Sequence, residues 1–430
     1  MKNTKSATRF WAALVIFSLV GQVAWVVENM YLNVFIYKMF AASASQISLM
    51  VAASSVAATV TTLLIGALSD KLGKRKIFIC GGYLCWGVSI LSFGLIREDW
   101  LSSVLPATAS AAAVGISLVI ILDCVMTFFG SAANDACFNA WLTDSTDETN
   151  RGAAEGINAM MPLVAILAVF GGFMGLNQDL PESWTVIFFV IGGIVLVLGI
   201  LGFWLIREPA VDTADNQNYL KNIIYGFRPS VIRENPRMYL TLLSYAVFGI
   251  SINIFMPYLI LYYEKSLGMT NYVFVFAPAI ILAAVFTALY GRIYDKKGFA
   301  ASVLPSLGLL MGGYVLLYLC RHTALVFVGT VLMMCGYLSG MAVFGAMLRD
   351  HTPRNRAGMF QGQRIIGQVL LPGIIGPAIG AAVLKNAQTI IDSDGRTVFL
   401  PNANIFLAAL IAAVCIVISL LPLLKSLKKK

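Results

Sequence analysis

The sequence predicts an all-α membrane protein with twelve transmembrane helices in two six-helix bundles. Three observations predict this fold class. Of the 430 residues, 59% are hydrophobic and only 12% are charged, whereas about 25% of an ordinary soluble domain is charged. Twelve apolar segments are each long enough to cross a bilayer. A polar linker and two pairs of matching loops divide the chain into two similar halves.

The composition excludes several classes of protein. A mean hydropathy of +0.82 rules out a disordered chain and a soluble multidomain enzyme. The net charge of +9 comes from short basic clusters between apolar segments, which indicates membrane orientation and not a nucleic-acid partner. The seven cysteines form no CxxC pair, and the two histidines, His322 and His351, fall in loops. We therefore expect no enzyme, no metal site and no cofactor beyond a coupling ion, H+ or Na+.

Each predicted span is a run of about 20 or more mainly apolar residues. The runs must be helices, because a helix satisfies its own backbone in lipid and barrel strands would alternate in polarity. The first run has no small-residue cleavage signature after it, so we expect a retained span and not a signal peptide. The spans are 10–36, 46–68, 77–96, 111–134, 153–176, 184–206, 238–263, 272–291, 301–320, 323–348, 358–384 and 402–424.

The basic residues predict the orientation of the spans. With a cytoplasmic N-terminus, 23 Lys and Arg residues fall in the inner segments, six fall in the outer loops, and Arg364 lies within a span. Inner loops of membrane proteins carry the excess of basic residues. We therefore expect a multi-pass protein of the cell membrane, in contact with its lipids, with both termini in the cytoplasm.

A polar segment with three prolines separates the sixth span from the seventh. It is typical of a linker between two bundles. The predicted organisation is an N-terminal bundle over 1–206, a cytoplasmic linker over 207–237 and a C-terminal bundle over 238–430. We expect the chain to act as a monomer on a small-molecule substrate.

Two loop pairs repeat between the halves. Residues 66–76, after the second span, match residues 291–298, after the eighth, in their Gly, Asp, Lys and Gly positions at an offset of 225. Residues 144–151, after the fourth span, match 350–356 at an offset of about 206. Matching pairs in the same order predict two parallel halves related by an axis along the membrane normal.

The 66–76 segment resembles the signature loop of the major facilitator superfamily of secondary transporters. That signature reads Gly-x-x-x-Asp-(Arg/Lys)-x-Gly-(Arg/Lys)-(Arg/Lys), and the chain meets it at Gly66, Asp70, Lys71, Gly73, Lys74 and Arg75. The resemblance implies a two-bundle fold with alternating access. Residues 134–152 are similar to the glycoside–pentoside–hexuronide:cation symporters, although Thr61, Thr62 and Leu63 stand where that branch often carries an acid.

The resemblance also implies a cytoplasmic gating latch in the signature loops. We assign to it Gly66, Asp70, Lys71, Gly73, Arg75, Asp144, Arg151, Asp295 and Arg356. The alternative is that such residues only anchor the chain at the inner surface, which we favour for Lys74, Lys76 and the three C-terminal lysines.

Ionisable residues within spans predict the transport site, because each costs about 2.5–3.5 kcal/mol at a helix centre and normally faces a cavity or a partner. Glu28, Asp123 and Arg364 lie inside spans, whereas Asp135 and Glu155 lie near the inner interface. Helical spacing groups polar residues around them into stripes. The predicted coupling and substrate residues are Glu28, Asp123, Asp135, Arg364, Gln22, Asn29, Trp25, Asn134, Gln368 and Tyr245.

Several roles stay open for these residues. Asp123 can carry a proton, ligate sodium or serve as a structural hydrogen-bond hub. Arg364 can pair with an acid or hold an anionic substrate. Trp25 and Tyr245 offer flat faces for a sugar ring. Asp135 and Glu155 serve gating or are simply solvated.

Three functions compete at this stage. The first is a cation-coupled symporter of a small polar solute, with a sugar or glycoside preferred. The second is a proton-coupled exporter of drugs or lipids, for which the Gly/Pro pattern over 373–380 is the sequence feature. The third is a membrane enzyme with a metal at Asp144, Asp147 and Glu148, which we disfavour because no histidine joins that run.

Overall fold

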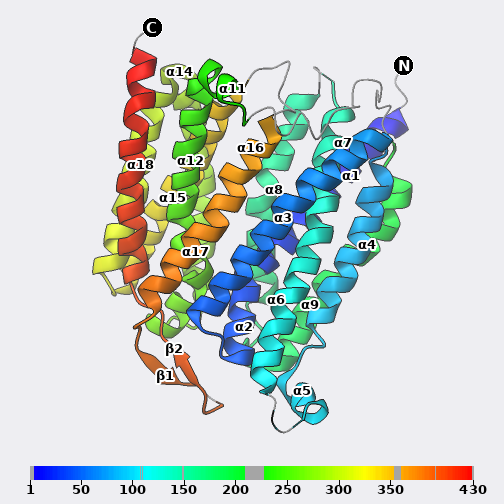
Figure 1. Cartoon of the computed structure of the whole chain (residues 1–430), viewed down its shortest axis with the longest axis vertical. Helices are drawn as coiled ribbons and strands as arrows, with labels where there is room; N and C mark the ends of the chain where they lie inside the picture. Colours follow the sequence, from blue (N-terminus) through cyan, green and yellow to red (C-terminus); the bar gives the residue numbers. More distant parts are fainter. Residues whose placement is uncertain are drawn as a thin grey trace. The chain divides into compact units, whose positions relative to one another are not determined.

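The computed structural model describes residues 4–106, 108, 110–147, 150–208, 227–352, 360–392 and 394–428. The chain divides into two compact units. The first comprises Met1–Ala42 and Ala53–Leu220, and the second comprises Ser43–Ala52 and Lys221–Lys430. Helices dominate both units (Figure 1).

The first unit contains the helices that correspond to the first six predicted spans. One of them, α3, begins in the segment that groups with the second unit. The elements are α1 (Thr4–Val26), η1 (Val27–Tyr31), α2 (Leu32–Phe40), α3 (Ala44–Leu72), α4 (Lys76–Phe93), α5 (Glu98–Val104), α6 (Ala111–Gly130), η2 (Ser131–Phe138), α7 (Asn139–Asp144), α8 (Arg151–Phe173) and α9 (Pro181–Leu205).

The second unit contains the helices of the last six spans and one short hairpin. The antiparallel hairpin pairs Thr389 with Phe399 in a loop where no strand was predicted. The elements are α11 (Pro229–Glu234), α12 (Pro236–Phe255), η3 (Met256–Tyr258), α13 (Leu259–Leu261), η4 (Tyr262–Ser266), α14 (Val273–Leu319), α15 (Thr323–His351), α16 (Gln361–Ile365), η6 (Ile366–Leu370), α17 (Leu371–Leu384), β1 (Thr389–Ile391), β2 (Thr397–Phe399) and α18 (Asn404–Lys428).

Eleven helical segments of the described chain are long and apolar enough to cross a membrane. One of them, α14, has 47 residues, about twice the length that a bilayer requires. Gly298 breaks it with φ 76° and ψ −177°, a conformation that is essentially restricted to glycine. The two parts of α14 therefore correspond to two predicted spans, and the all-α fold with twelve spans is confirmed.

Glycines allow the helices within each unit to pack closely. In the first unit α4 packs on α9, and a Cβ on Gly87 would lie 2.6 Å from the backbone nitrogen of Leu196. In the second unit α17 packs on α12, and a Cβ on Gly376 would lie 2.5 Å from Cβ of Asn253. Small residues drive helix association in lipid because they let backbones approach.

Candidate transport and gating sites

The signature loop joins α3 to α4 through a turn that requires glycine. Gly73 has φ 63°, in the left-handed region that residues with a Cβ disfavour. Two residues later, Arg75 is only 4% exposed. The turn therefore places a long cationic side chain inside the first unit.

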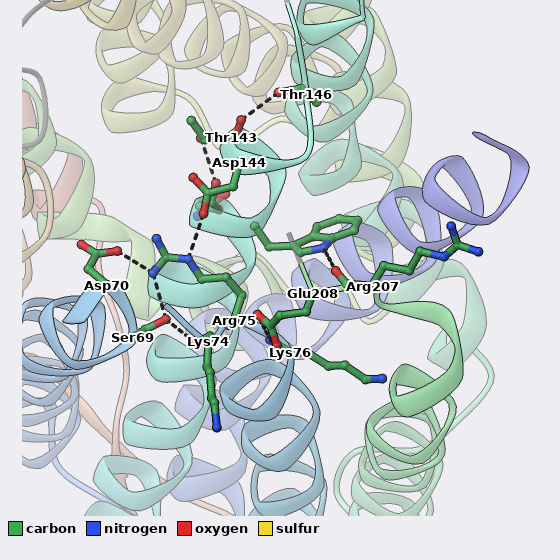
Figure 2. A network of polar contacts seen from close by, with 12 residues as sticks. Ser69, Asp70, Lys74, Arg75, Lys76, Thr143, Asp144, Thr146, Arg207 and Glu208 are labelled. Carbon is green, nitrogen blue, oxygen red and sulfur yellow. Dashed lines mark hydrogen bonds and ion pairs between the residues drawn. The ribbon is translucent and has the colours of Figure 1, made fainter. Parts of the chain in front are cut away.

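Arg75 is held by two carboxylates and a hydroxyl, as Figure 2 shows. Its Nη1 lies 2.5 Å from Oδ1 of Asp70, and its Nε donates to Oδ2 of Asp144 at 3.0 Å. Nη1 also donates to Oγ of Ser69 at 2.9 Å. Burial alone would lower the pKa of Arg75, but the neighbouring Asp70 and Asp144 carboxylates raise it above its ordinary value. The guanidinium thus stays charged in this loop.

A third acid, Glu208, caps the helix that follows the loop. Its carboxylate accepts hydrogen bonds from the backbone N–H of Arg75 and, at 3.2 and 3.3 Å, from that of Lys76 (Figure 2). No side chain at the N-cap position of α4 performs this task. Negative charge at a helix N-terminus satisfies free N–H groups and complements the helix dipole.

Sequence reasoning missed Glu208, because the residue falls at the start of the predicted linker. The available signal was the lack of Ser, Thr, Asp or Asn immediately before α4, which implies a capping group from elsewhere. The indole of Trp141 holds the same segment by donating to the carbonyl of Arg207 at 2.9 Å.

The other predicted latch residues have different surroundings. Arg151 donates to Thr143 and Thr146 at 3.4 Å, and Lys71 is exposed. Gly66 lies half-buried on α3, and Asp295 is exposed on α14. Arg356 lies outside the described residues. Of the predicted latch residues, Arg75 contacts both Asp70 and Asp144, and all three belong to the first unit.

The matching loops of the second unit have a different contact. At the repeat offsets, Ala300 corresponds to Arg75, Tyr294 to Ser69 and Asp350 to Asp144. The Tyr294 hydroxyl donates directly to Oδ2 of Asp350 at 2.5 Å. In the second unit a tyrosine hydroxyl therefore contacts the acid directly, whereas in the first unit Arg75 lies between Ser69 and Asp144.

Glu28 and Asp123 lie close together inside the first unit. Oε1 of Glu28, on η1, accepts a hydrogen bond from Thr127 Oγ1 at 2.8 Å. Asp123 lies one turn before Thr127 on α6, and the two acids are 7% and 1% exposed. Oε2 of Glu28 and Oδ1 of Asp123 are buried without a hydrogen-bond partner among the described residues. Two acceptor oxygens are therefore available for a proton or a ligand.

The other predicted residues of the first unit differ in their contacts and in their exposure. Asp135, on η2, accepts from Ser131 at 3.0 Å and lies within electrostatic range of Glu28. Asn134 is buried against Gly21, and the Trp25 ring packs on that of Trp86 at 5.0 Å. Asn29 donates to the carbonyl of Trp25 at 2.8 Å, and Gln22 is half-buried. Glu155 is exposed on α8.

Arg364, Gln368 and Tyr245 belong to the second unit. Arg364, on α16, is half-buried, and its Nε has no hydrogen-bond partner among the described residues. Tyr245, on α12, lies within electrostatic range of it and stacks on Phe344 with ring centroids 5.4 Å apart. Gln368 is half-buried on η6.

Among the described residues, four of the spans contain a π-helical turn. The turns are η1, η2, η4 and η6. They carry five of the predicted site residues, namely Glu28, Asn29, Asn134, Asp135 and Gln368. Such turns are rare and often lie at functional sites.

Comparisons with known proteins identify the family. A search of curated protein sequences finds no match. Among solved structures, the chain is similar to the nucleoside transporter NupG (TM-score 0.71, 12% identity, 96% of this chain and 99% of that one covered). It is similar to a bacterial homologue of the human lysosomal transporter Spinster (TM-score 0.69, 16% identity, 97% of this chain and 96% of that one covered). It is also similar to the xylose transporter XylE from E. coli (TM-score 0.67, 12% identity, 96% of this chain and 98% of that one covered). These likenesses show the fold.

A family profile gives the assignment itself. The profile described as Major Facilitator Superfamily matches residues 11–377, which include both copies of the signature loop. The chain is therefore a member of the Major Facilitator Superfamily, a multi-span membrane transporter and not an enzyme.

Proposed function

We propose that this transporter moves a small polar solute, with a sugar or glycoside favoured, by alternating access coupled to a proton or sodium gradient. We place it in the cell membrane as a monomer with both termini in the cytoplasm. The distribution of basic residues supports that orientation.

The pairing of Glu28 with Asp123 is the single observation that carries the proposal. Thr127 bonds to Glu28 one turn from Asp123, so two spans bring their carboxylates to the same buried place. Each acid keeps a buried oxygen without a partner in the described chain. Isolated buried carboxylates are costly, and a bound proton or sodium ion removes that cost. Ion release then changes the charge inside the first unit, which is what coupling requires.

The preference for a sugar rests on weaker support. The structurally similar proteins include a xylose transporter and a nucleoside transporter, and a nucleoside also carries a pentose. The buried amide nitrogen of Asn134 has no hydrogen-bond partner among the described residues, so it can donate to a hydroxyl group.

Asp123→Asn tests the coupling role. In proteoliposomes with an imposed proton or sodium gradient, screened against a panel of sugars and glycosides, we expect the variant to lose gradient-driven accumulation. Exchange of labelled solute across the membrane at equal concentrations continues, because it needs no net ion movement. Asp99→Asn, the same change at an exposed acid of α5, leaves accumulation intact. Normal gradient-driven accumulation by Asp123→Asn would show that Asp123 is not the coupling residue.

The exporter alternative gains no support from α17. The Gly/Pro pattern that suggested it includes Gly376 and Gly380, and both glycines pack closely against α12. A packing role accounts for the pattern without a drug or lipid substrate.

A further inference from the structure

Thr127 contacts one of the two acids of the proposed coupling site, although it is not among the predicted site residues. It lies on α6, is 1% exposed, and donates from its hydroxyl to Oε1 of Glu28 on η1 at 2.8 Å. Both side chains are buried, so this hydrogen bond is shielded from water. A hydrogen bond to a charged group is roughly twice as strong as one between neutral groups. The contact is therefore able to influence the charge state of Glu28.

A threonine inside a helix normally satisfies its hydroxyl within the same helix. The usual acceptor is a carbonyl oxygen three or four residues earlier. Thr241 and Thr330, two other fully buried threonines, donate in this way to the carbonyls of Arg237 and Val326, both at 2.7 Å. Thr127 donates to a different helical segment instead. Its hydroxyl is thus directed at the acid and not at its own helix.

The hydrogen bond distinguishes the two oxygens of Glu28. Oε1 is held by Thr127, whereas Oε2 is buried without a hydrogen-bond partner in the described part of the chain. Oδ1 of Asp123, one helical turn before Thr127, is buried and unpartnered in the same sense. The other titratable groups within electrostatic range of Glu28 are Asp123, Asp135 and the thiol of Cys124. A cation therefore finds a free acceptor at Oε2, on an acid that lies near other acids.

A donated hydroxyl changes how tightly a carboxylate binds a cation. Desolvation favours the neutral form of a buried carboxyl group, and a hydrogen bond donated to the charged form opposes that preference. A coupling site must bind its ion and later release it. A donor on one oxygen keeps the ion exchangeable, and it leaves the other oxygen as the binding position.

We propose that Thr127 is a positioning residue of the coupling site: it holds Oε1 of Glu28, directs the coupling ion to Oε2 and sets the affinity for that ion. This inference rests on the proposed function, because it takes Glu28 and Asp123 as the acids that bind the ion. The hydroxyl performs this task and the methyl group does not. Serine at position 127 therefore supports the site, whereas valine, which has nearly the same shape as threonine, does not.

The proton is the probe, because it binds a carboxylate whichever cation drives transport. Infrared absorption of protonated carboxyl groups in the purified full chain is followed against pH, without solute or gradient, and Glu28→Gln identifies the band that depends on this acid. Loss of the donor disfavours the charged carboxylate. We therefore expect Thr127→Val to strengthen proton binding at Glu28 about tenfold, which moves the midpoint of the band up by about one pH unit.

Matched variants separate the hydroxyl from the rest of the side chain. Thr127→Ser keeps the hydroxyl, and we expect its midpoint to stay close to that of the wild type. Thr241→Val makes the same change at a buried threonine that bonds to its own helix, and it leaves the midpoint unchanged. Unfolding temperatures show whether each variant is folded. Thr127→Ala, which also lacks the hydroxyl, replaces Thr127→Val if the latter is unstable.

Two results would overturn the inference. The first is a wild-type midpoint in Thr127→Val. The second is a midpoint in Thr127→Ser as high as that in Thr127→Val, which would show that the hydroxyl is not the cause. A failure of the proposed function looks different, because Asp123→Asn then accumulates solute normally in proteoliposomes while the midpoint in Thr127→Val is still shifted.

Discussion

Arg75 shows how much of a loop can depend on one side chain. A guanidinium has five donors in a fixed plane, and here they reach Asp70, Asp144 and Ser69 at once. The two carboxylates are themselves about three-quarters buried, with 24% and 25% of their side chains exposed. Loss of the cation therefore leaves two desolvated acids close together.

We expect Arg75→Gln to lower the free energy of unfolding by about 2–3 kcal/mol, because removing one partner of a buried pair strands the other. Asp144→Asn in the same background restores part of the loss. A double-mutant cycle on thermal or denaturant unfolding measures the coupling. Lys71→Gln, at an exposed position of the same loop, is the control. Additive effects of Arg75→Gln and Asp144→Asn would contradict the contact.

At the scale of elements, the spans followed from hydropathy but their irregular turns did not. A π-helical turn adds one residue to a helix without changing its polarity, so neither composition nor spacing reveals it. The stripe over 123–135 was predicted from regular spacing, and the turn η2 interrupts that regularity before Asp135. The Glu208 cap was missed for another reason, since 132 residues separate it from Lys76.

The break in α14 is testable by a single substitution. Gly298→Ala places a Cβ at φ 76°, and we expect it to destabilise the protein by about 1–2 kcal/mol. Gly308→Ala, in the same helix with open space around it and without positive φ, is neutral or slightly stabilising. Unfolding temperatures of the detergent-solubilised variants compare the two. Equal stability would show that the break does not require glycine.

At the scale of the whole molecule, the two halves carry opposite charges within their spans. The first holds Glu28 and Asp123, and the second holds Arg364. This asymmetry was readable from the sequence because charges in apolar segments are conspicuous. What the sequence did not show is that Glu28 and Asp123 share a neighbour in Thr127, since that contact joins positions 99 residues apart.

The proposed coupling predicts the response to voltage. One monovalent cation that moves with one neutral sugar carries one net charge across the membrane. At a fixed ion gradient, we therefore expect a potassium diffusion potential of about −100 mV, negative inside, to raise sugar accumulation by up to about 50-fold, since that potential is worth about 2.3 kcal/mol per charge. Accumulation that does not respond to the potential would refute a stoichiometry of one cation to one neutral sugar.

The divergence between the two copies of the signature loop has a practical consequence. In the copy that kept Arg75, one cation lies between two acids, whereas in the copy with Ala300 a neutral phenol meets a single carboxylate. Dissolved salt screens exposed charges strongly and buried charges much less. Because Arg75 is almost fully buried, we expect neither copy to open when the ionic strength of the buffer is raised.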